Sequence, residues 1–173
     1  MAAQEIRIPR PEHPNPMMVR SDWKTLNGEW EFVKDPAISG KERKLYEQES
    51  FPLRITVPFC MESDISGVGD KDFCECVWYR REVDLAQDWL ADGRRVLLHI
   101  GACDYRTDVY VNGKHLGYHI GGSVSFAFDI TSAAKPGKNV IIICAEDRLR
   151  SGNQPGGKQC KKYASKDYRF TAV

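Results

Sequence analysis

The sequence predicts an all-β fold, an antiparallel β-sandwich, from three observations. Between residues 101 and 131, two segments alternate apolar and polar residues with the period of two that a half-buried strand shows. Asn112-Gly113 stands between strand segments, and this pair is preferred in two-residue hairpin turns because both positions take positive φ. Strand signals recur along the chain without a long helical period, which is typical of two packed antiparallel sheets.

Three strands are expected in the first half of the chain. Residues 26–33 alternate, with Trp30 on the apolar face, and residues 54–57 form a short strand that Pro58 ends. Residues 77–83 place their apolar side chains on one face and Trp78 on the other. Short helical turns are expected at residues 86–90 and 132–134.

The later strands supply most of the expected core. Residues 95–100 and 140–145 are nearly continuous apolar runs, which predicts central strands covered on both faces. The residues expected in the core are Val96, Leu98, Ile100, Val109, Val111, Phe126, Phe128, Ile141 and Ile143.

Length and charge narrow the class of protein. A chain of 173 residues fits one domain, here residues 17–173, preceded by a proline-rich leader at residues 1–16 that we expect to be extended. The 25 basic and 24 acidic residues nearly cancel, and no basic stripe appears, so nucleic acid and anionic membranes are poor partners. No apolar run reaches the roughly 18 residues of a membrane-spanning helix.

The cysteines and the N-terminal residues indicate a compartment. The six cysteines are irregularly spaced, and a chain of this length can build a core without disulfides, so we expect free thiols. Residues 1–10 lack the apolar segment of a signal peptide. We therefore expect a reducing, cytoplasmic location.

Three apparent ligand motifs fail on inspection, so no metal or cofactor is expected. Residues 152–158 match a phosphate-binding loop, but Gln159 replaces the hydroxyl residue that would hold Mg²⁺. His115 and His119 have the spacing at which two histidines on a helix can bind one metal ion. Here they lie on a hairpin arm, where residues four apart are separated by about 13 Å, so we expect them to be surface histidines. Residues 64–70 carry valine where a calcium loop needs an oxygen ligand.

Seven short segments together resemble one known family. In chain order they are L-N-G-E-W-E-F at 26–32, V-P-F at 57–59, V-W-Y-R-R at 77–81, L-L-H-I-G-A-C-D-Y at 97–105, V-Y-V-N-G at 109–113, F-D-I-T at 128–131 and N-Q-P-G-G-K-Q at 153–159. They resemble the sugar-binding domain at the N-terminus of glycoside hydrolase family 2 enzymes, the β-galactosidase and β-glucuronidase group. The resemblance covers roughly residue 11 to the end and implies a jelly roll of the galactose-binding type.

The sequence predicts no catalytic residues. Retaining glycosidases need two carboxylates about 5 to 5.5 Å apart. The resemblance implies that the general acid lies in an Asn-Glu dipeptide in a downstream barrel, yet none of the five asparagines here precedes a glutamate. The resemblance implies that barrel, an immunoglobulin-like domain and carbohydrate as partners, with homo-oligomers possible. It also implies that the chain stops before the last strand of its sandwich.

Two carboxylates are candidates for substrate binding. The resemblance implies that one loop of the domain supplies polar side chains to the rim of the sugar site, and a carboxylate can accept hydrogen bonds from adjacent hydroxyls. Asp147, at the end of a strand, and Asp167 are the candidates, with a solvated loop carboxylate as the alternative for each. Asp147 is preferred, because strand-end loops on a rigid sandwich commonly carry such contacts. Asp104 is expected to cap a turn.

Two other function classes stay open. A free-standing carbohydrate-binding module would expose aromatic rings for stacking on sugars, and Trp78, Tyr110 and Tyr118 lie on the outward-pointing alternation. The domain could alternatively serve only as a structural interface for a barrel or for subunit assembly.

Overall fold

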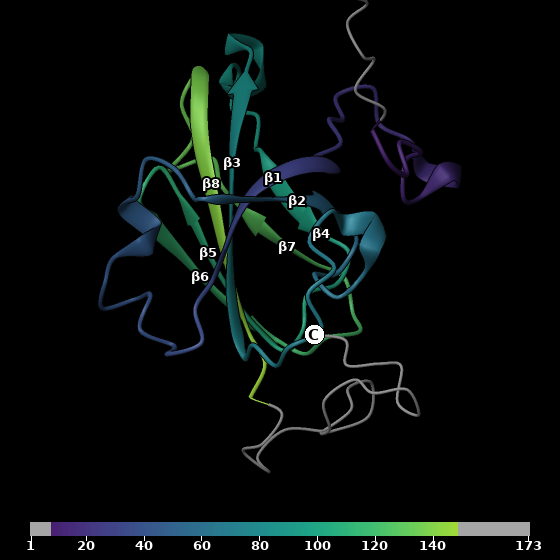
Figure 1. Ribbon diagram of the computed structural model, residues 1–173. Helices are drawn as coiled ribbons and strands as arrows, with labels where there is room; N and C mark the ends of the chain where they lie inside the picture. The colour runs from purple at the N-terminus through teal and green to yellow at the C-terminus, as the bar shows by residue number, and fades with distance from the viewer. Residues whose placement is uncertain (1–7, 149–173) are drawn as a thin grey trace, which may run out of the picture.

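The computed structural model describes residues 8–148, which form two layers of antiparallel strands (Figure 1). The strands are β1 (Gly28–Lys34), β2 (Leu53–Val57), β3 (Cys76–Leu85), β4 (Leu97–Ile100), β5 (Arg106–Val111), β6 (Lys114–Ile120), β7 (Phe126–Asp129) and β8 (Gly137–Glu146). Short 3-10 helices lie at η1 (Pro16–Met18), η2 (Leu45–Glu47), η3 (Asp64–Ser66) and η4 (Gln87–Leu90). Within these residues no helix is both long and apolar enough to span a membrane. The predicted antiparallel β-sandwich is confirmed.

The larger layer has six strands in the order β2-β1-β3-β8-β5-β6, and β4 pairs with β7 in the smaller layer. The longest ladder joins β3 to β8, from Cys76 opposite Glu146 to Leu85 opposite Gly137. These two strands run side by side through the middle of the sheet (Figure 1). Because β8 is paired on both edges and buried along its centre, the prediction of a central strand at residues 140–145 is confirmed.

The main core lies between the two layers. Phe32, Val109 and Ile143 from the six-stranded sheet pack in one cluster with Leu98 from β4. The predicted core residues found buried are Val96, Leu98, Val109, Val111, Ile141 and Ile143. Ile100, Phe126 and Phe128 are only partly buried, because the smaller layer has two short strands and solvent reaches its margins.

The hairpin between β5 and β6 turns at the predicted pair. Asn112 has φ 50° and Gly113 has φ 79°, the left-handed values that a type I′ turn needs. The Asn112 side chain also ties the turn to neighbouring chain, since its Nδ2 donates to Asn139 Oδ1 at 2.9 Å. The turn residues have the backbone conformation that a type I′ hairpin requires, and the predicted hairpin is confirmed.

The prediction that residues 95–100 form a strand covered on both faces is wrong. Strand β4 belongs to the two-stranded layer, and only one of its faces meets the core. Leu98 is buried, while the side chain of Leu97 is 45% exposed. A continuous apolar run does not show how many faces of a strand are buried. It places apolar side chains on both faces, but it does not show that another layer of structure packs on each of them.

A second correction concerns the outer face of the six-stranded sheet, the face turned away from β4 and β7. Trp78 and Tyr110 were expected to be exposed there, but they are only 1% and 5% exposed. The chain between β1 and β2 folds over them: Tyr46 stacks on Tyr110 with ring centroids 4.8 Å apart, and Phe51 joins the same buried cluster. We call residues 35–51 the covering segment.

Candidate functional site

The chemically richest part of the described chain lies where β8 ends and β3 and β5 begin. Glu146 is the register partner of Cys76 on one side and of Arg106 on the other. Two hollows flank the sheet near this end. One, of about 310 Å³, lies between the layers, and the other, of about 320 Å³, lies on the outer face.

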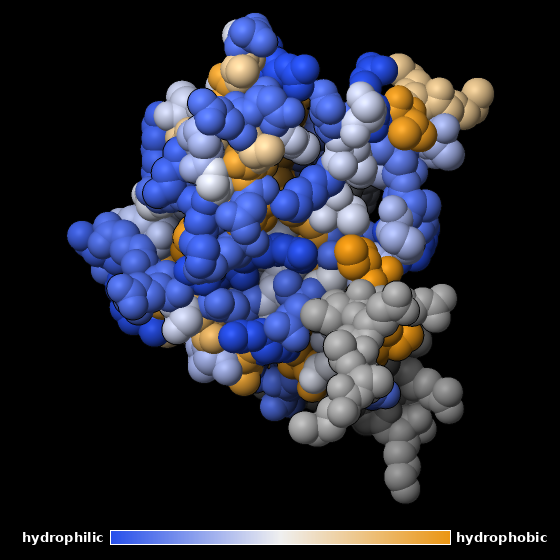
Figure 2. All heavy atoms as spheres, turned by 90° about the horizontal axis from the view of Figure 1, so that it is seen from above, coloured by the Kyte–Doolittle hydropathy of each residue, from blue (hydrophilic) through white to orange (hydrophobic). Residues whose placement is uncertain are grey.

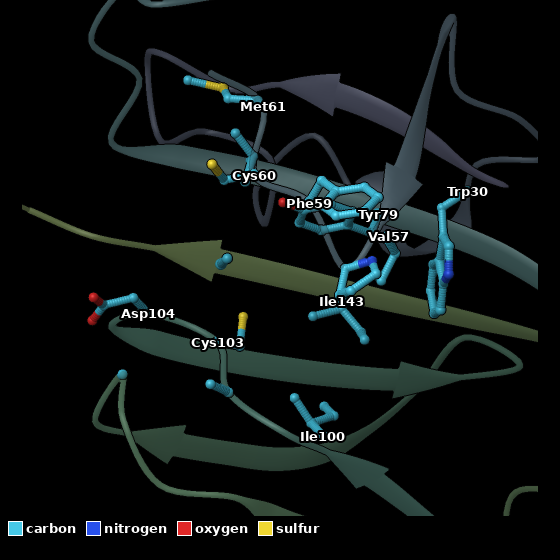
Figure 3. Close-up of a pocket in the computed structure, with 15 residues that line it drawn as sticks. Trp30, Val57, Phe59, Cys60, Met61, Tyr79, Ile100, Cys103, Asp104 and Ile143 are labelled. Carbon is cyan, nitrogen blue, oxygen red and sulfur yellow. The ribbon is translucent and has the colours of Figure 1, made fainter. Parts of the chain in front are cut away.

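The inner hollow is mainly apolar (Figure 3). Trp30, Tyr79 and Ile143 from the six-stranded sheet face Ile100 across it. Burial raises the pKa of the Tyr79 hydroxyl, so this group stays neutral. A site of this size and character suits an apolar group rather than a sugar, whose hydroxyls would lose their hydrogen bonds to water there.

Asp104 lies at one end of the inner hollow, with its carboxylate pointing away from the apolar side chains (Figure 3). It packs closely against the Gly122 backbone, where a Cβ would fall 2.1 Å from Asp104 Oδ1. A larger residue at position 122 would displace the Asp104 carboxylate, and the contact joins the segment before β5 to the segment after β6. Nearby, burial raises the pKa of the Cys103 thiol to about 11, so this group is protonated at neutral pH.

The outer hollow is polar, and its walls carry charges of both signs. Lys41, Arg106 and Arg148 line it together with Asp35 and Glu146. The mixture of signs does not make a strong site for an anion or a cation. Its side chains instead bind each other, as the two buried carboxylates of this face show.

Asp108 is a buried carboxylate on β5 that anchors one side of the outer face. It accepts hydrogen bonds from Lys41 Nζ at 2.7 Å and Arg106 Nε at 2.9 Å, and His115 Nε2 lies 2.9 Å away. Burial opposes ionisation of Asp108, but the bonds from Arg106 and Lys41 outweigh it and hold the carboxyl pKa below its ordinary value. The Lys41 contact attaches the covering segment to the sheet.

Asp35 is the second buried carboxylate and anchors the start of the covering segment. It accepts hydrogen bonds from the Gly40 amide at 2.7 Å, from Trp78 Nε1 at 3.2 Å and from Arg43 Nη2 at 2.8 Å. Burial disfavours the ionised carboxylate and acts to raise the pKa of Asp35, but these hydrogen bonds together outweigh burial, so the pKa is lowered. Gly40 is required here, because a Cβ would fall 2.5 Å from Trp78 Nε1.

Asp35 and Asp108 do not have the character of a catalytic pair. A general acid in a glycosidase needs a raised pKa, and both of these carboxyls have a lowered one. The sequence reasoning missed both residues. The sequence does contain one signal for Asp108, because it is a charged residue within the alternating pattern of β5, between Thr107 and Val109. A carboxylate at such a position must be either exposed to solvent or paired with a cation.

The predicted substrate-binding residues have different outcomes. Asp147 follows β8 directly and is 0% exposed, and its amide donates to the Glu75 carbonyl at 2.8 Å. The alternative of a solvated loop carboxylate is therefore wrong for Asp147. Asp167 lies outside the described residues, as does the segment at residues 152–159.

Of the three aromatic residues that a free-standing module could use for stacking on sugars, Tyr118 alone is exposed, at 56%. The guanidinium of Arg106 lies 3.9 Å from its ring centroid, so one ring face is already in use. Seen from above, the molecule is largely hydrophilic with separate hydrophobic patches (Figure 2). Trp78 and Tyr110 therefore cannot stack on a sugar, and Tyr118 offers one ring face.

Comparison with known proteins places the chain in a family. The family model for the glycosyl hydrolases family 2 sugar binding domain matches residues 45–154. A β-glucuronidase of Felis catus is 38% identical over 124 residues, which cover 66% of this chain and 19% of that protein. A β-glucuronidase of Paenibacillus borealis is 31% identical over 140 residues, covering 78% of this chain and 23% of that protein.

Solved structures agree with these relatives. The β-glucuronidase of Ruminococcus gnavus in complex with uronic deoxynojirimycin superposes with a TM-score of 0.70 at 25% identity, covering 89% of this chain and 26% of that one. This chain thus spans only about a fifth to a quarter of the length of these proteins. From the matched segment and the shared sandwich, this chain belongs to the sugar-binding domain family of the family 2 glycoside hydrolases.

Proposed function

We propose that this domain works as a non-catalytic part of a longer glycosidase and supports the substrate site of a separate catalytic barrel. The observation that carries the proposal is the length relationship: the matched segment covers 78% of this chain but 23% of the Paenibacillus borealis β-glucuronidase. The chemistry of the described residues supports it, because the buried carboxylates on the outer face are paired with cations.

The substrate class we propose is β-glucuronides. The support is that both the Felis catus and the Paenibacillus borealis relatives are β-glucuronidases, at 38% and 31% identity. A second class, β-galactosides, is favoured by the β-galactosidase of an Arthrobacter strain, which is 29% identical over 126 residues. Comparing hydrolysis of nitrophenyl glucuronide and nitrophenyl galactoside by the longer protein distinguishes the two.

Contact with the sugar is proposed for Asp147 or Asp167. A carboxylate can accept hydrogen bonds from two neighbouring hydroxyls. The complete burial of Asp147 supports a role of its side chain in the fold at the end of β8. The burial of Asp147 thus reverses the preference drawn from the sequence and leaves Asp167 as the candidate for the sugar contact.

The test places Asp147→Ala and Asp167→Ala separately in the longer glycosidase. A lost hydrogen bond to a charged group costs about 1.5 to 3 kcal/mol, so kcat/KM for a sugar-contacting residue falls by roughly one to two orders of magnitude. The loss is expected for Asp167→Ala, with an unchanged melting temperature, and it disappears on a substrate that lacks the contacted hydroxyl. Equal losses on both substrates with a lowered melting temperature would overturn the assignment.

A free-standing carbohydrate-binding module is the second candidate function. Its support is weaker, because Trp78 and Tyr110 are buried and Tyr118 carries Arg106 on one face. Calorimetric titration of the 173-residue chain with glucuronic acid and galactose separates the two. Saturable binding at millimolar or lower concentration favours the module, and the absence of heat favours a domain that needs its catalytic partner.

We propose a cytoplasmic location on the basis of the thiols. Cys60, Cys74, Cys76, Cys103 and Cys144 are all free in the part of the chain that the structure describes. Unpaired cysteines in this number are typical of a reducing compartment. Fractionation of cells that express the protein, followed by immunoblotting, tests this.

A further inference from the structure

The two edge strands of the six-stranded sheet differ in composition. β2, at one edge, has five residues, lies between Pro52 and Pro58, and carries the charged Arg54. Proline and charge at a sheet edge discourage pairing with another chain. β6, at the other edge, has seven residues and no proline, and its one Lys, Arg, Asp or Glu is Lys114, beside the hairpin turn. The β6 edge therefore lacks the protection that the β2 edge has.

The backbone of β6 presents hydrogen-bonding groups on the side away from β5. The Gly121 amide donates to the Tyr105 carbonyl at 2.8 Å, which fixes where the hydrogen-bonded pairs of the β5–β6 ladder fall. Backbone groups alternate in direction along an antiparallel strand, so those of Tyr118 and Ile120 point away from β5. Among residues 8–148, no strand pairs with β6 on that side. The N–H and C=O groups of these two residues can therefore bond to a further strand.

The side chains at the same two positions are apolar and exposed. Tyr118 and Ile120 are 56% and 47% exposed, and they share one face of the sheet because they are two residues apart on a strand. The register shift between Val109 and Tyr110 lies toward the hairpin turn, so the ladder remains regular at Tyr118 and Ile120. The Arg106 guanidinium packs on the Tyr118 ring and holds it in place. This end of β6 thus combines open backbone groups with apolar side chains.

We propose that β6 pairs with β6 of a second copy of this chain, antiparallel and about a two-fold axis, so that the two sheets join into one. In the register that places Tyr118 opposite Ile120, the N–H and C=O groups of both residues bond across the axis. The same register puts an aromatic side chain beside a β-branched one twice, which is a favourable cross-strand pair. A two-fold contact needs only one self-complementary surface, and this edge is one.

The charges of the chain do not oppose this contact. In the proposed register, the two Lys114 side chains lie at opposite ends of the paired strands, so no like charges face each other. The formal net charge of the chain is +1, so long-range repulsion between two copies is small. A second copy also brings its own Tyr118 and Ile120, whereas an unrelated peptide would have to supply matching side chains.

The first experiment measures self-association of the full 173-residue chain by sedimentation velocity, from low to high micromolar concentration. We expect a reversible equilibrium between monomer and dimer. Tyr118→Lys and Ile120→Lys each remove the apolar pair and bring one lysine of each copy close to the axis. Either variant should raise the dimer dissociation constant by roughly tenfold or more.

Leu53→Lys is the matched control, because Leu53 is an exposed apolar residue of the opposite edge strand, β2. It adds the same charge to the chain and should leave the dissociation constant unchanged. Circular dichroism checks that each variant is folded. An equal effect of Leu53→Lys and Ile120→Lys would overturn the assignment to β6, because net charge rather than the edge would then control association.

A second measurement needs no variant. Amide hydrogen exchange is followed in the wild-type chain while its concentration is raised, and the Tyr118 and Ile120 amides should become protected as the dimer forms, while those of β2 do not change. The proposal is overturned if the chain stays monomeric at high micromolar concentration, or if a dimer forms without protecting these two amides. Full protection in the dilute monomer also overturns it, since another part of the chain would then cover the edge.

Discussion

The two faces of the six-stranded sheet are both buried, but by different means. The inner face meets a second sheet, β4 and β7, and its cluster is built from aliphatic and aromatic side chains such as Phe32 and Leu98. The outer face meets a stretch of chain, the covering segment, whose only regular structure is η2. That segment brings charged groups with it, and Asp35 and Asp108 are buried between their partners.

The difference shows what each kind of cover needs. A sheet satisfies its own backbone groups, so it can cover an apolar face with apolar side chains alone. An irregular segment has backbone amides that find no ladder partner, and Asp35 accepts two of them, from Ser39 and Gly40. Buried carboxylates on the outer face are therefore structural groups that hold the covering segment.

The largest expected effects come from one large aromatic residue on each face. Phe32→Ala on the inner face and Trp78→Ala on the outer face should each lower the free energy of unfolding by about 3 to 5 kcal/mol, because both side chains are fully buried. Urea denaturation followed by fluorescence or circular dichroism measures both. A loss below about 1 kcal/mol for Trp78→Ala alone would show that the covering segment does not pack on the sheet.

Asp108→Asn tests the charged anchor of the outer face. The amide leaves Lys41 without its anionic partner, but Lys41 and Arg106 are partly exposed and regain water. We expect a loss of about 1 to 3 kcal/mol at neutral pH, measured by urea denaturation. Glu49→Gln is the control, because Glu49 is exposed in the same covering segment, and it should change the unfolding free energy much less.

The pH dependence of stability sharpens the same test. The folded-state pKa of Asp108 is lowered, so its stabilising contribution is complete above the ordinary carboxyl pKa of about 3.9 and is lost as pH falls through the folded value. Asp35 acts in the same direction. The unfolding free energies of the wild type and Asp108→Asn should thus converge as pH is lowered from 5 toward 2. A constant difference across that range would assign the loss to packing instead.

Phe126→Ala probes the margin of the inner core. Phe126 is only partly buried and stacks on His119 with ring centroids 3.9 Å apart. The loss should be about 1 to 2 kcal/mol, less than the figure for a fully buried phenylalanine. A loss equal to that of Phe32→Ala would mean that β7 is more deeply covered than the two-layer arrangement allows.

Tyr118→Ala should have the smallest effect. The ring is exposed and interacts mainly with the Arg106 guanidinium, and such exposed cation–π contacts contribute about 0.5 to 1 kcal/mol. Thermal unfolding and sugar titration of this variant serve together. If titration with glucuronic acid shows binding that Tyr118→Ala abolishes, the carbohydrate-binding module regains support over the partner-dependent domain.

Much of the fold could be predicted because its signals are local. Alternation placed Val109 and Val111 in the core, and Asn112-Gly113 fixed the hairpin through the φ values that the turn requires. The covering segment was missed because it has no periodic pattern, and the contacts that hold it are distant in sequence: the Lys41 to Asp108 ion pair spans 67 positions.

The candidate site was harder to predict than the fold. Asp147 was a candidate for sugar contact, with a solvated loop carboxylate as the alternative, yet tertiary packing buries it completely and its backbone amide donates to the Glu75 carbonyl. Cys76 and Cys144 were expected as free thiols, and the 3.6 Å contact between their Sγ atoms depends on the register between β3 and β8. Single-residue chemistry could be anticipated from the sequence, but the pairing of residues across strands could not.

The most direct test of the account is whether the purified 173-residue chain hydrolyses nitrophenyl β-glucuronide or nitrophenyl β-galactoside. The account expects no hydrolysis above a matched blank, because the described carboxylates Asp35 and Asp108 are paired and have lowered pKa values. Hydrolysis that survives removal of host glycosidases, and that disappears when one carboxylate of this chain is replaced by its amide, would contradict the assignment as a non-catalytic domain.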